Sequence, residues 1–210
     1  MIKFKHKKYS ESLLKSRLRR FLAEMNESEY ESGMNWYALM NQWCEGVSES
    51  YKIPMFKVCG VFAALSPQTA VDFNKELCIE YFDKGTARQI GFLVRKCDDI
   101  MQAKTKEEVK TILSGNKITA FYINILDCDV NLGCVTVDRH AIACLIQTPA
   151  TVEAISDKNS SMTNNQYKYF ESIYISLANE IGILPQQLQA ITWEVYRRLR
   201  GLKQYDYTPF

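Results

Sequence analysis

Residues 113–120 read Leu113-Ser114-Gly115-Asn116-Lys117-Ile118-Thr119-Ala120. A glycine between two apolar segments is typical of a helix that ends in a tight turn and of a second helix that begins directly after it. The next motif along the chain is Val135-Thr136-Val137-Asp138-Arg139-His140. It places a single carboxylate among apolar residues at the start of a further helix. The two motifs therefore predict a succession of short helices joined by tight turns.

Helical periodicity continues through most of the remaining chain. Apolar residues recur every three or four positions in two long segments. These residues are Leu13, Leu14, Leu18, Phe21, Leu22 and Met25 in the first segment, and Tyr167, Phe170, Ile173, Tyr174, Leu177 and Ile181 in the second. Each set lies on one face of a helix, so we expect both segments to be amphipathic helices.

Helix start signals support the same assignment. Thr105 and Thr163 are each followed three residues later by Glu or Gln, which is the spacing of a capping box, and Pro185 suits the first turn of a helix. No convincing pair of alternating strands and no Asn-Gly or Asp-Gly turn is present. We therefore predict an all-α fold. Chain order suggests two helical lobes, one of residues 54–150 and one of residues 1–53 plus 151–210, with an active-site cleft between them.

The composition is that of an ordinary globular protein. Hydrophobic residues make up 47% of the 210 residues and charged residues 24%, which excludes a mainly disordered chain. The longest nearly apolar stretch, 58–65, is far shorter than the roughly 20 residues of a membrane span. Seven cysteines without a C-x-x-C pair predict reduced core thiols. We expect a cytoplasmic protein (in the host cytoplasm if viral) with no membrane partner, no metal and no cofactor.

Positive charge is concentrated at the start of the chain. Residues 1–20 contain eight Lys and Arg residues against Glu11 alone, although the whole chain has a formal net charge of only +2. Such a segment either contacts phosphate groups or is a solvated terminus. A second basic cluster consists of Arg197, Arg198, Arg200 and Lys203. It also suits the C-terminal end of a helix, where cations complement the helix dipole.

Few residues could carry familiar catalytic chemistry. The only histidines are His6 and His140, and neither has the neighbours of a metal site or of a Ser-His-Asp triad. No glycine-rich phosphate loop is present. Asp138 alone is more typical of a helix cap than of a catalyst, and Lys117 alone is typical of a solvated side chain. Both readings stay open on these residues.

Four motifs taken together resemble the helix-hairpin-helix (HhH-GPD) DNA glycosylase superfamily. Residues 113–120 are similar to its hairpin, L-P-G-V-G-x-K-T-A, and residues 137–140 are similar to its catalytic segment, V-D-T-H. Residues 64–75 and 90–100 resemble two helical motifs of endonuclease III-like members. The motifs follow the family's order and cover about residues 58–147. The resemblance implies the two-lobed glycosylase fold and an enzyme that extrudes its target base from DNA.

The resemblance also implies a role for each matching residue. Asp138 is the expected catalytic carboxylate, which stabilises the cationic sugar and activates the attacking group. Lys117 is the expected amine that attacks the sugar carbon and forms a Schiff base. Gln68 is expected to fill the space that the extruded base leaves. The other expected DNA contacts are Gly115, Asn116, Thr119, Arg139 and His140.

The chain departs from the family pattern at three points. Only Gly115 remains of the two hairpin glycines, Arg139 replaces a small residue, and no cysteine follows Cys144 to complete an iron–sulfur cluster. We expect a monomeric, nucleoid-associated DNA glycosylase-like enzyme for a modified or damaged base, in duplex or single-stranded DNA. One alternative is a transferase of the same fold that modifies hypermodified thymine in DNA. The other alternative is a non-catalytic helical module that only binds nucleic acid.

Overall fold

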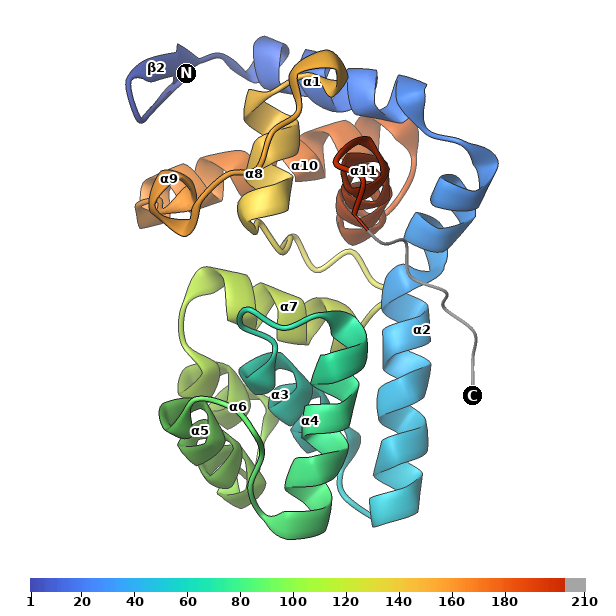
Figure 1. The fold of residues 1–210 in the computed structure, drawn as a ribbon, viewed down its shortest axis with the longest axis vertical. Coiled ribbons are helices and arrows are strands. Elements are labelled where there is room, and N and C mark those ends of the chain that lie inside the picture. Colours follow the sequence, from blue (N-terminus) through green and yellow to red (C-terminus); the bar gives the residue numbers. More distant parts are fainter. Residues whose placement is uncertain (203–210) are drawn as a thin grey trace. The chain divides into compact units, whose positions relative to one another are not determined.

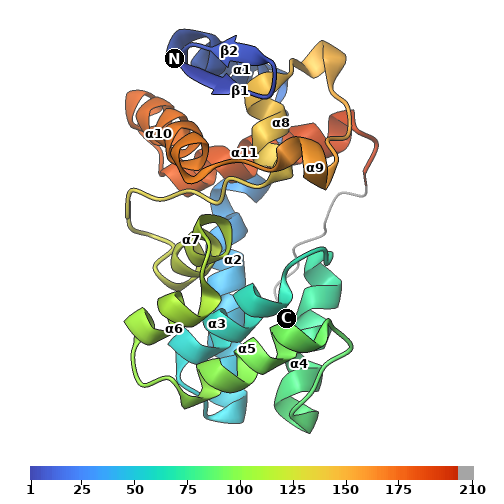
Figure 2. The same ribbon diagram turned by 90° about the vertical axis from the view of Figure 1, so that its left-hand side faces the viewer.

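The computed structural model describes residues 1–202, which are mainly helical (Figures 1 and 2). Helix accounts for 71% of the structure and strand for 3%, so the predicted all-α class is confirmed. The helices of this range are α1 (Glu11–Glu24), α2 (Glu27–Tyr51), α3 (Met55–Leu65), α4 (Val71–Lys84), α5 (Gly91–Gln102), α6 (Lys106–Leu113), α7 (Asn116–Leu126), α8 (Arg139–Ile146), α9 (Asp157–Ser160), α10 (Asn164–Ile181) and α11 (Pro185–Leu199), with a short 3₁₀ turn at Pro149–Thr151. None of them is both long enough and apolar enough to cross a membrane. Lys203 and the last part of the predicted lobe 151–210 lie outside the described residues.

The start of the chain differs from the sequence prediction. Strands β1 (Ile2–Phe4) and β2 (Lys7–Tyr9) pair antiparallel, so the expectation of no paired strands is wrong here. Phe4 and Tyr9 are buried, and the Phe4 ring lies edge-on to Phe170 of α10 with ring centroids 5.2 Å apart. Burial of these two rings stabilises the hairpin, but strands of three residues are too short to show a reliable alternation in the sequence.

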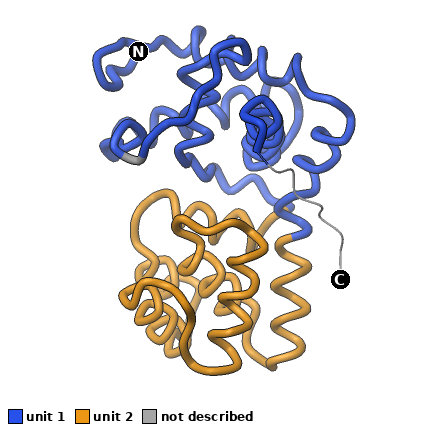
Figure 3. Tube along the Cα trace, in the orientation of Figure 1, with its two compact units in different colours: residues 1–39, 129–209 blue, residues 40–128, 210 orange. Residues whose placement is uncertain are grey.

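The chain forms two compact units (Figure 3). Unit 1 contains Met1–Leu39 and the described residues from Asp129 onward, and unit 2 contains Met40–Cys128. These boundaries differ from the predicted lobes at two places: residues 129–150, including Asp138, belong to unit 1, and residues 40–53 belong to unit 2. The reason for the first difference is the packing of α8, which is buried over Ala141–Leu145 and contacts α1 and α11 of the same unit.

Unit 2 is built around α3 (Figure 2). Residues 58–65 of this helix are all buried, since α4, α5, α6 and α7 pack against it. A helix that is apolar on every side is stable in water only when it is covered in this way. Gly60 permits the close approach, because a Cβ at this position would lie 2.8 Å from Cγ1 of Val109.

Helices α1, α8, α10 and α11 surround the core of unit 1. The predicted apolar faces of α1 and α10 are confirmed near their centres, where Leu14, Leu18 and Phe170 are buried. Leu13, at the start of α1, is exposed instead. Gly33 of α2 lies against α11, where a Cβ would be 2.5 Å from Cα of Ile191, so no larger residue fits there without a shift.

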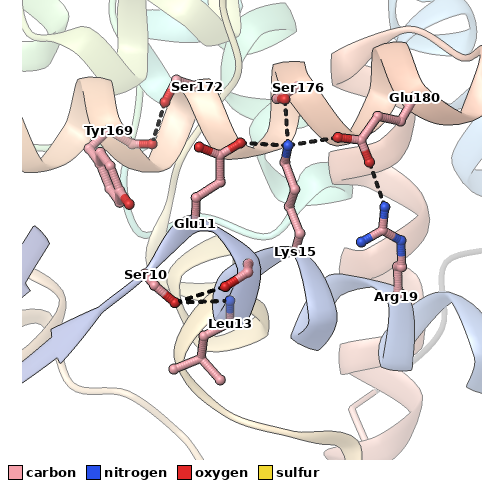
Figure 4. A network of polar contacts seen from close by, with 10 residues as sticks. Ser10, Glu11, Leu13, Lys15, Arg19, Tyr169, Ser172, Ser176 and Glu180 are labelled. Atoms are coloured by element: carbon pink, nitrogen blue, oxygen red, sulfur yellow. Dashed lines mark hydrogen bonds and ion pairs between the residues drawn. The ribbon is translucent and has the colours of Figure 1, made fainter. Parts of the chain in front are cut away.

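A network of charged side chains joins α1 to α10 (Figure 4). Lys15 Nζ lies 2.6 Å from Glu11 Oε1, 2.6 Å from Ser176 Oγ and 2.7 Å from Glu180 Oε1. Arg19 pairs with the second oxygen of Glu180. The hydrogen bond to Glu11 raises the pKa of Lys15 most, and the hydrogen bond to Glu180 raises it further. The same bond to Lys15 lowers the pKa of Glu180. Lys15 and Arg19 therefore hold two helices together.

Candidate active site

Asp138 is the N-cap of α8. Its Oδ1 accepts hydrogen bonds from the backbone N–H groups of His140 at 2.9 Å and Ala141 at 2.8 Å. Its Oδ2 accepts no hydrogen bond from any of the described residues and lies 3.6 Å from His140 Nδ1. The side chain is 20% exposed. One carboxylate oxygen thus caps the helix, while the other stays available to a ligand.

Helix α10 fixes the extended segment that leads to Asp138. The Tyr167 hydroxyl donates to the carbonyl of Val135 at 2.7 Å and accepts from the N–H of Val137 at 3.2 Å. Glu171 accepts the N–H of Val135 at 3.1 Å. Burial raises the pKa of Tyr167, so its hydroxyl stays a neutral donor. These buried bonds restrict the backbone, and a restricted backbone positions the carboxylate accurately.

His140 is held on two sides within unit 1. Its Nδ1 accepts a hydrogen bond of 3.0 Å from the indole Nε1 of Trp193, and its ring stacks on Tyr196 with centroids 5.1 Å apart. An Nδ1 that accepts a hydrogen bond carries no proton, so this geometry assigns a neutral imidazole with its proton on Nε2. His140 therefore lies beside the carboxylate of Asp138 as a neutral imidazole, with Nδ1 as its nearest ring nitrogen.

Aromatic and cationic groups surround Trp193. The rings of Trp36 and Trp193 pack edge to face, with their centroids 6.0 Å apart. The guanidinium carbon of Arg197 lies 4.7 Å from the centroid of the Trp193 ring. The cation–π contact and the packing hold the indole in place. Among residues 1–202, no three or more His, Cys, Asp or Glu side chains are grouped so as to hold a metal ion. The groups that the structure brings together around Asp138 are its carboxylate, the neutral imidazole of His140 and the ring of Tyr196, with Trp193 bonded to the imidazole.

The turn at 113–116 lies in unit 2, between α6 and α7. Ser114 has a φ of 49° and Gly115 a φ of 76°, both in the left-handed region. Lys96 Nζ donates to the carbonyl of Leu113 at 2.6 Å and to Ser114 Oγ at 3.2 Å, which fixes the turn. Asn116, Lys117 and Thr119 follow in the first turn of α7, and Lys117 is exposed.

Gln68 also has a strained backbone. Its φ of 63° places a non-glycine residue in the left-handed region, which costs about 1–2 kcal/mol. It is exposed in the loop between α3 and α4. The hydrogen bonds of Thr69 Oγ1 to Ser66 O at 2.8 Å and of Gln89 Nε2 to Leu65 O at 3.2 Å hold this loop. Strain that the surrounding structure maintains is a common property of functional loops.

A family model described as a family of unknown function, DUF7178, matches residues 1–200 of the chain. The chain belongs to this family. No curated protein and no solved structure matches it. The part of the chain that matches the DUF7178 model includes Asp138, His140 and Trp193, and all the candidate residues of unit 2.

In this DUF7178 chain the candidate residues fall into two groups. Asp138, Arg139 and His140 lie together at the start of α8 in unit 1. The other candidates belong to unit 2, at separate positions in its 66–70 loop and at the start of α7: Gln68, Gly115, Asn116, Lys117 and Thr119.

Three residues that position Asp138 and His140 are not among the candidate site residues that the sequence predicts, although one of them, Tyr167, is predicted as part of an apolar helix face. These are Tyr167, Glu171 and Trp193. Glu171 could have been recognised from the sequence, because it is a carboxylate next to the apolar face of α10, where a buried charge needs a polar partner. Nothing in the sequence around Trp193 marks its bond to a histidine 53 residues away.

Proposed function

We propose that this DUF7178 chain is a DNA glycosylase-like enzyme that cleaves the N-glycosidic bond of a modified or damaged base. Asp138 is its catalytic carboxylate. The observation that carries the proposal is that the two oxygens of Asp138 differ in their contacts. Oδ1 caps α8, and Oδ2 remains available to a ligand. The similarity of four sequence motifs to the helix-hairpin-helix glycosylases supports the same function.

The chemistry needs a negative charge and a base at one point. As the bond between base and sugar breaks, its electron pair leaves with the base and positive charge develops on the sugar. The Asp138 carboxylate stabilises this charge, and Oδ2 accepts the proton of the water that bonds to the sugar carbon.

Water, rather than Lys117, is the proposed nucleophile. Lys117 is exposed in the first turn of α7. A lysine becomes nucleophilic when burial disfavours its charged form, and an exposed side chain lacks that effect.

The test is mass spectrometry of free bases and nucleosides after incubation with DNAs that carry different modified bases. The proposal predicts a released base and an abasic site, and neither product from the Asp138→Asn variant. A base of altered mass that remains attached to its sugar would replace the proposal with the transferase alternative. If the chain binds DNA but forms no product, and Asp138→Asn does not change the binding, the chain is a non-catalytic binding module.

A further inference from the structure

The β1–β2 hairpin is a fixed part of unit 1. Phe4 and Tyr9 are buried beneath it, and Gln166 of α10 donates to the backbone carbonyl of Lys3 at 2.8 Å. Lys5, in the turn, donates to the carbonyl of Lys158 at 2.9 Å. Side chains on the outer surface of the hairpin are therefore held at defined positions, unlike those of a loose terminus.

Three lysines of this hairpin have no internal partner. Lys3 and Lys8 are directly opposite each other in the strand register, whereas Lys7 is opposite the buried Phe4 and so lies on the other face of the hairpin, near its turn. All three are exposed, and their side chains form no ion pair or hydrogen bond with any residue that the structure describes. Like charges placed directly opposite each other destabilise a strand pair. The ammonium groups of Lys3 and Lys8 therefore repel each other, and a bound anion would reduce this repulsion.

Several other basic residues near the two termini are engaged within unit 1. Arg17 donates to the carbonyl of Ile146 at 2.6 Å, at the C-terminal end of α8. In the C-terminal cluster, Arg198 pairs with Glu29 at 2.6 Å and Arg197 stacks on Trp193. These contacts stabilise the fold, whereas Arg20 of α1 is exposed. We assign the predicted binding role to the hairpin lysines, which the strand pairing holds at defined positions.

We propose that Lys3, Lys7 and Lys8 of the β1–β2 hairpin bind the phosphodiester backbone of nucleic acid. Ammonium groups on flexible stems suit successive phosphates, because they need no fixed orientation. An anionic membrane is less suited, since stable binding there requires inserted apolar side chains, and Phe4 and Tyr9 are buried in unit 1. The inference concerns binding alone and holds for either reaction at Asp138.

The experiment measures the affinity for a labelled duplex and a labelled single strand over a range of salt concentrations. All chains carry Asp138→Asn, so that failure to bind is distinguished from failure to release a base. The test chain adds Lys3→Gln, Lys7→Gln and Lys8→Gln. The control chain adds Lys52→Gln, Lys84→Gln and Lys104→Gln, which remove the same charge from exposed positions in unit 2.

The salt dependence is the slope of log K against the logarithm of the salt concentration. In the test chain this slope should be shallower by about 2.7 for the duplex or by about 2.1 for the single strand, because three phosphate contacts are lost. The control chain should keep the original slope, and the melting temperature of the test chain should be unchanged or higher. Equal slopes in the two variants, or no binding of DNA by the parent chain, would overturn the proposal. Binding to vesicles of phosphatidylcholine and phosphatidylserine but not to DNA would overturn it in favour of a membrane.

Discussion

Asp138 and His140 form a pair whose geometry depends on Trp193. The indole N–H of Trp193 donates a hydrogen bond to Nδ1 of His140, and this Nδ1 lies only 3.6 Å from Oδ2 of Asp138. A proton on Nδ1 would displace the indole bond and place a positive charge beside the carboxylate. Trp193 therefore holds the His140 ring in one orientation beside Asp138 and favours its neutral form.

Trp193→Phe tests this positioning role, because it keeps an aromatic ring and removes the donor. We expect kcat for base release to fall about tenfold, the equivalent of one hydrogen bond. An unchanged kcat in a stable Trp193→Phe chain would mean that the hydrogen bond from the indole to His140 does not contribute to the reaction.

Lys117 is tested by trapping with borohydride, which reduces a Schiff base to a stable protein–DNA adduct. Because Lys117 is exposed, we expect base release without an adduct. Lys117→Gln should then lower the rate of base release less than tenfold. An adduct that disappears in Lys117→Gln would establish the amine as the nucleophile and contradict the proposed attack by water.

At the residue level, local contacts could be predicted and distant ones could not. The capping role of Asp138 follows from the sequence, because a cap bonds to N–H groups two and three residues ahead. The bond from Trp193 joins α11 to α8, and no local pattern encodes it. The left-handed backbone of Gln68 is equally invisible, since glutamine has no preference for that region.

At the element level, α1 and α10 are joined by the ion network around Lys15. The lowered pKa of Glu180 means that the folded state binds its proton less readily than the unfolded state. The stabilisation is therefore present above the ordinary pKa of 4.5 and is lost as the pH falls through the folded pKa. Acid should weaken the contact between α1 and α10.

Urea unfolding of the Glu180→Gln variant between pH 7 and pH 3 tests this contact. At pH 7 the variant should unfold at a lower urea concentration than the parent chain, and the two midpoints should converge toward pH 3. Glu49→Gln serves as the control, because Glu49 is exposed and has no ion-pair partner among residues 1–202. A constant difference at every pH would show that the ion pair does not carry the effect.

Element types also show where sequence patterns are informative. Helices α1 and α10 are long enough for several turns of apolar periodicity, and both were predictable from it. The β1–β2 hairpin was not, because it has three residues in each strand and Lys5 rather than glycine at its left-handed turn position. Its burial against Phe170 is a tertiary contact that the local sequence does not encode.

At the level of the whole molecule, helix packing defines the two units. Order along the chain groups residues 129–150 with the preceding helices, whereas α8 packs with α1 and α11. Which apolar helices pack together depends on complementary surfaces, and periodicity does not reveal them. The helical class was therefore predictable, and the boundaries of the units were not.

The cysteines report on the packing of both units. None of the seven forms a disulfide bond with another described residue. Cys44, Cys59, Cys78, Cys97 and Cys144 are buried, and Cys128 and Cys134 are half-buried. Burial raises the pKa of Cys97 to about 12 and also raises those of Cys44, Cys78 and Cys144. At pH 8 these buried groups are thiols, and thiols react slowly with disulfide reagents.

Titration with an aromatic disulfide reagent at pH 8 should give two fast thiols and five that react only as the chain unfolds. Replacing Cys128 and Cys134 with serine should remove the fast phase. Rapid reaction of a third thiol in the native chain would contradict the packing described for the unit that contains it.

The catalytic assignment is tested most directly by the rate of base release by Asp138→Asn on a DNA that the parent chain cleaves. Asparagine caps a helix about as well as aspartate, so the melting temperature and DNA affinity should be nearly unchanged. Loss of the charge should lower the rate by about 10²–10³-fold, as for other groups that stabilise a charged transition state. A stable Asp138→Asn chain that releases the base at near the parent rate would contradict the assignment and leave Asp138 as a helix cap only.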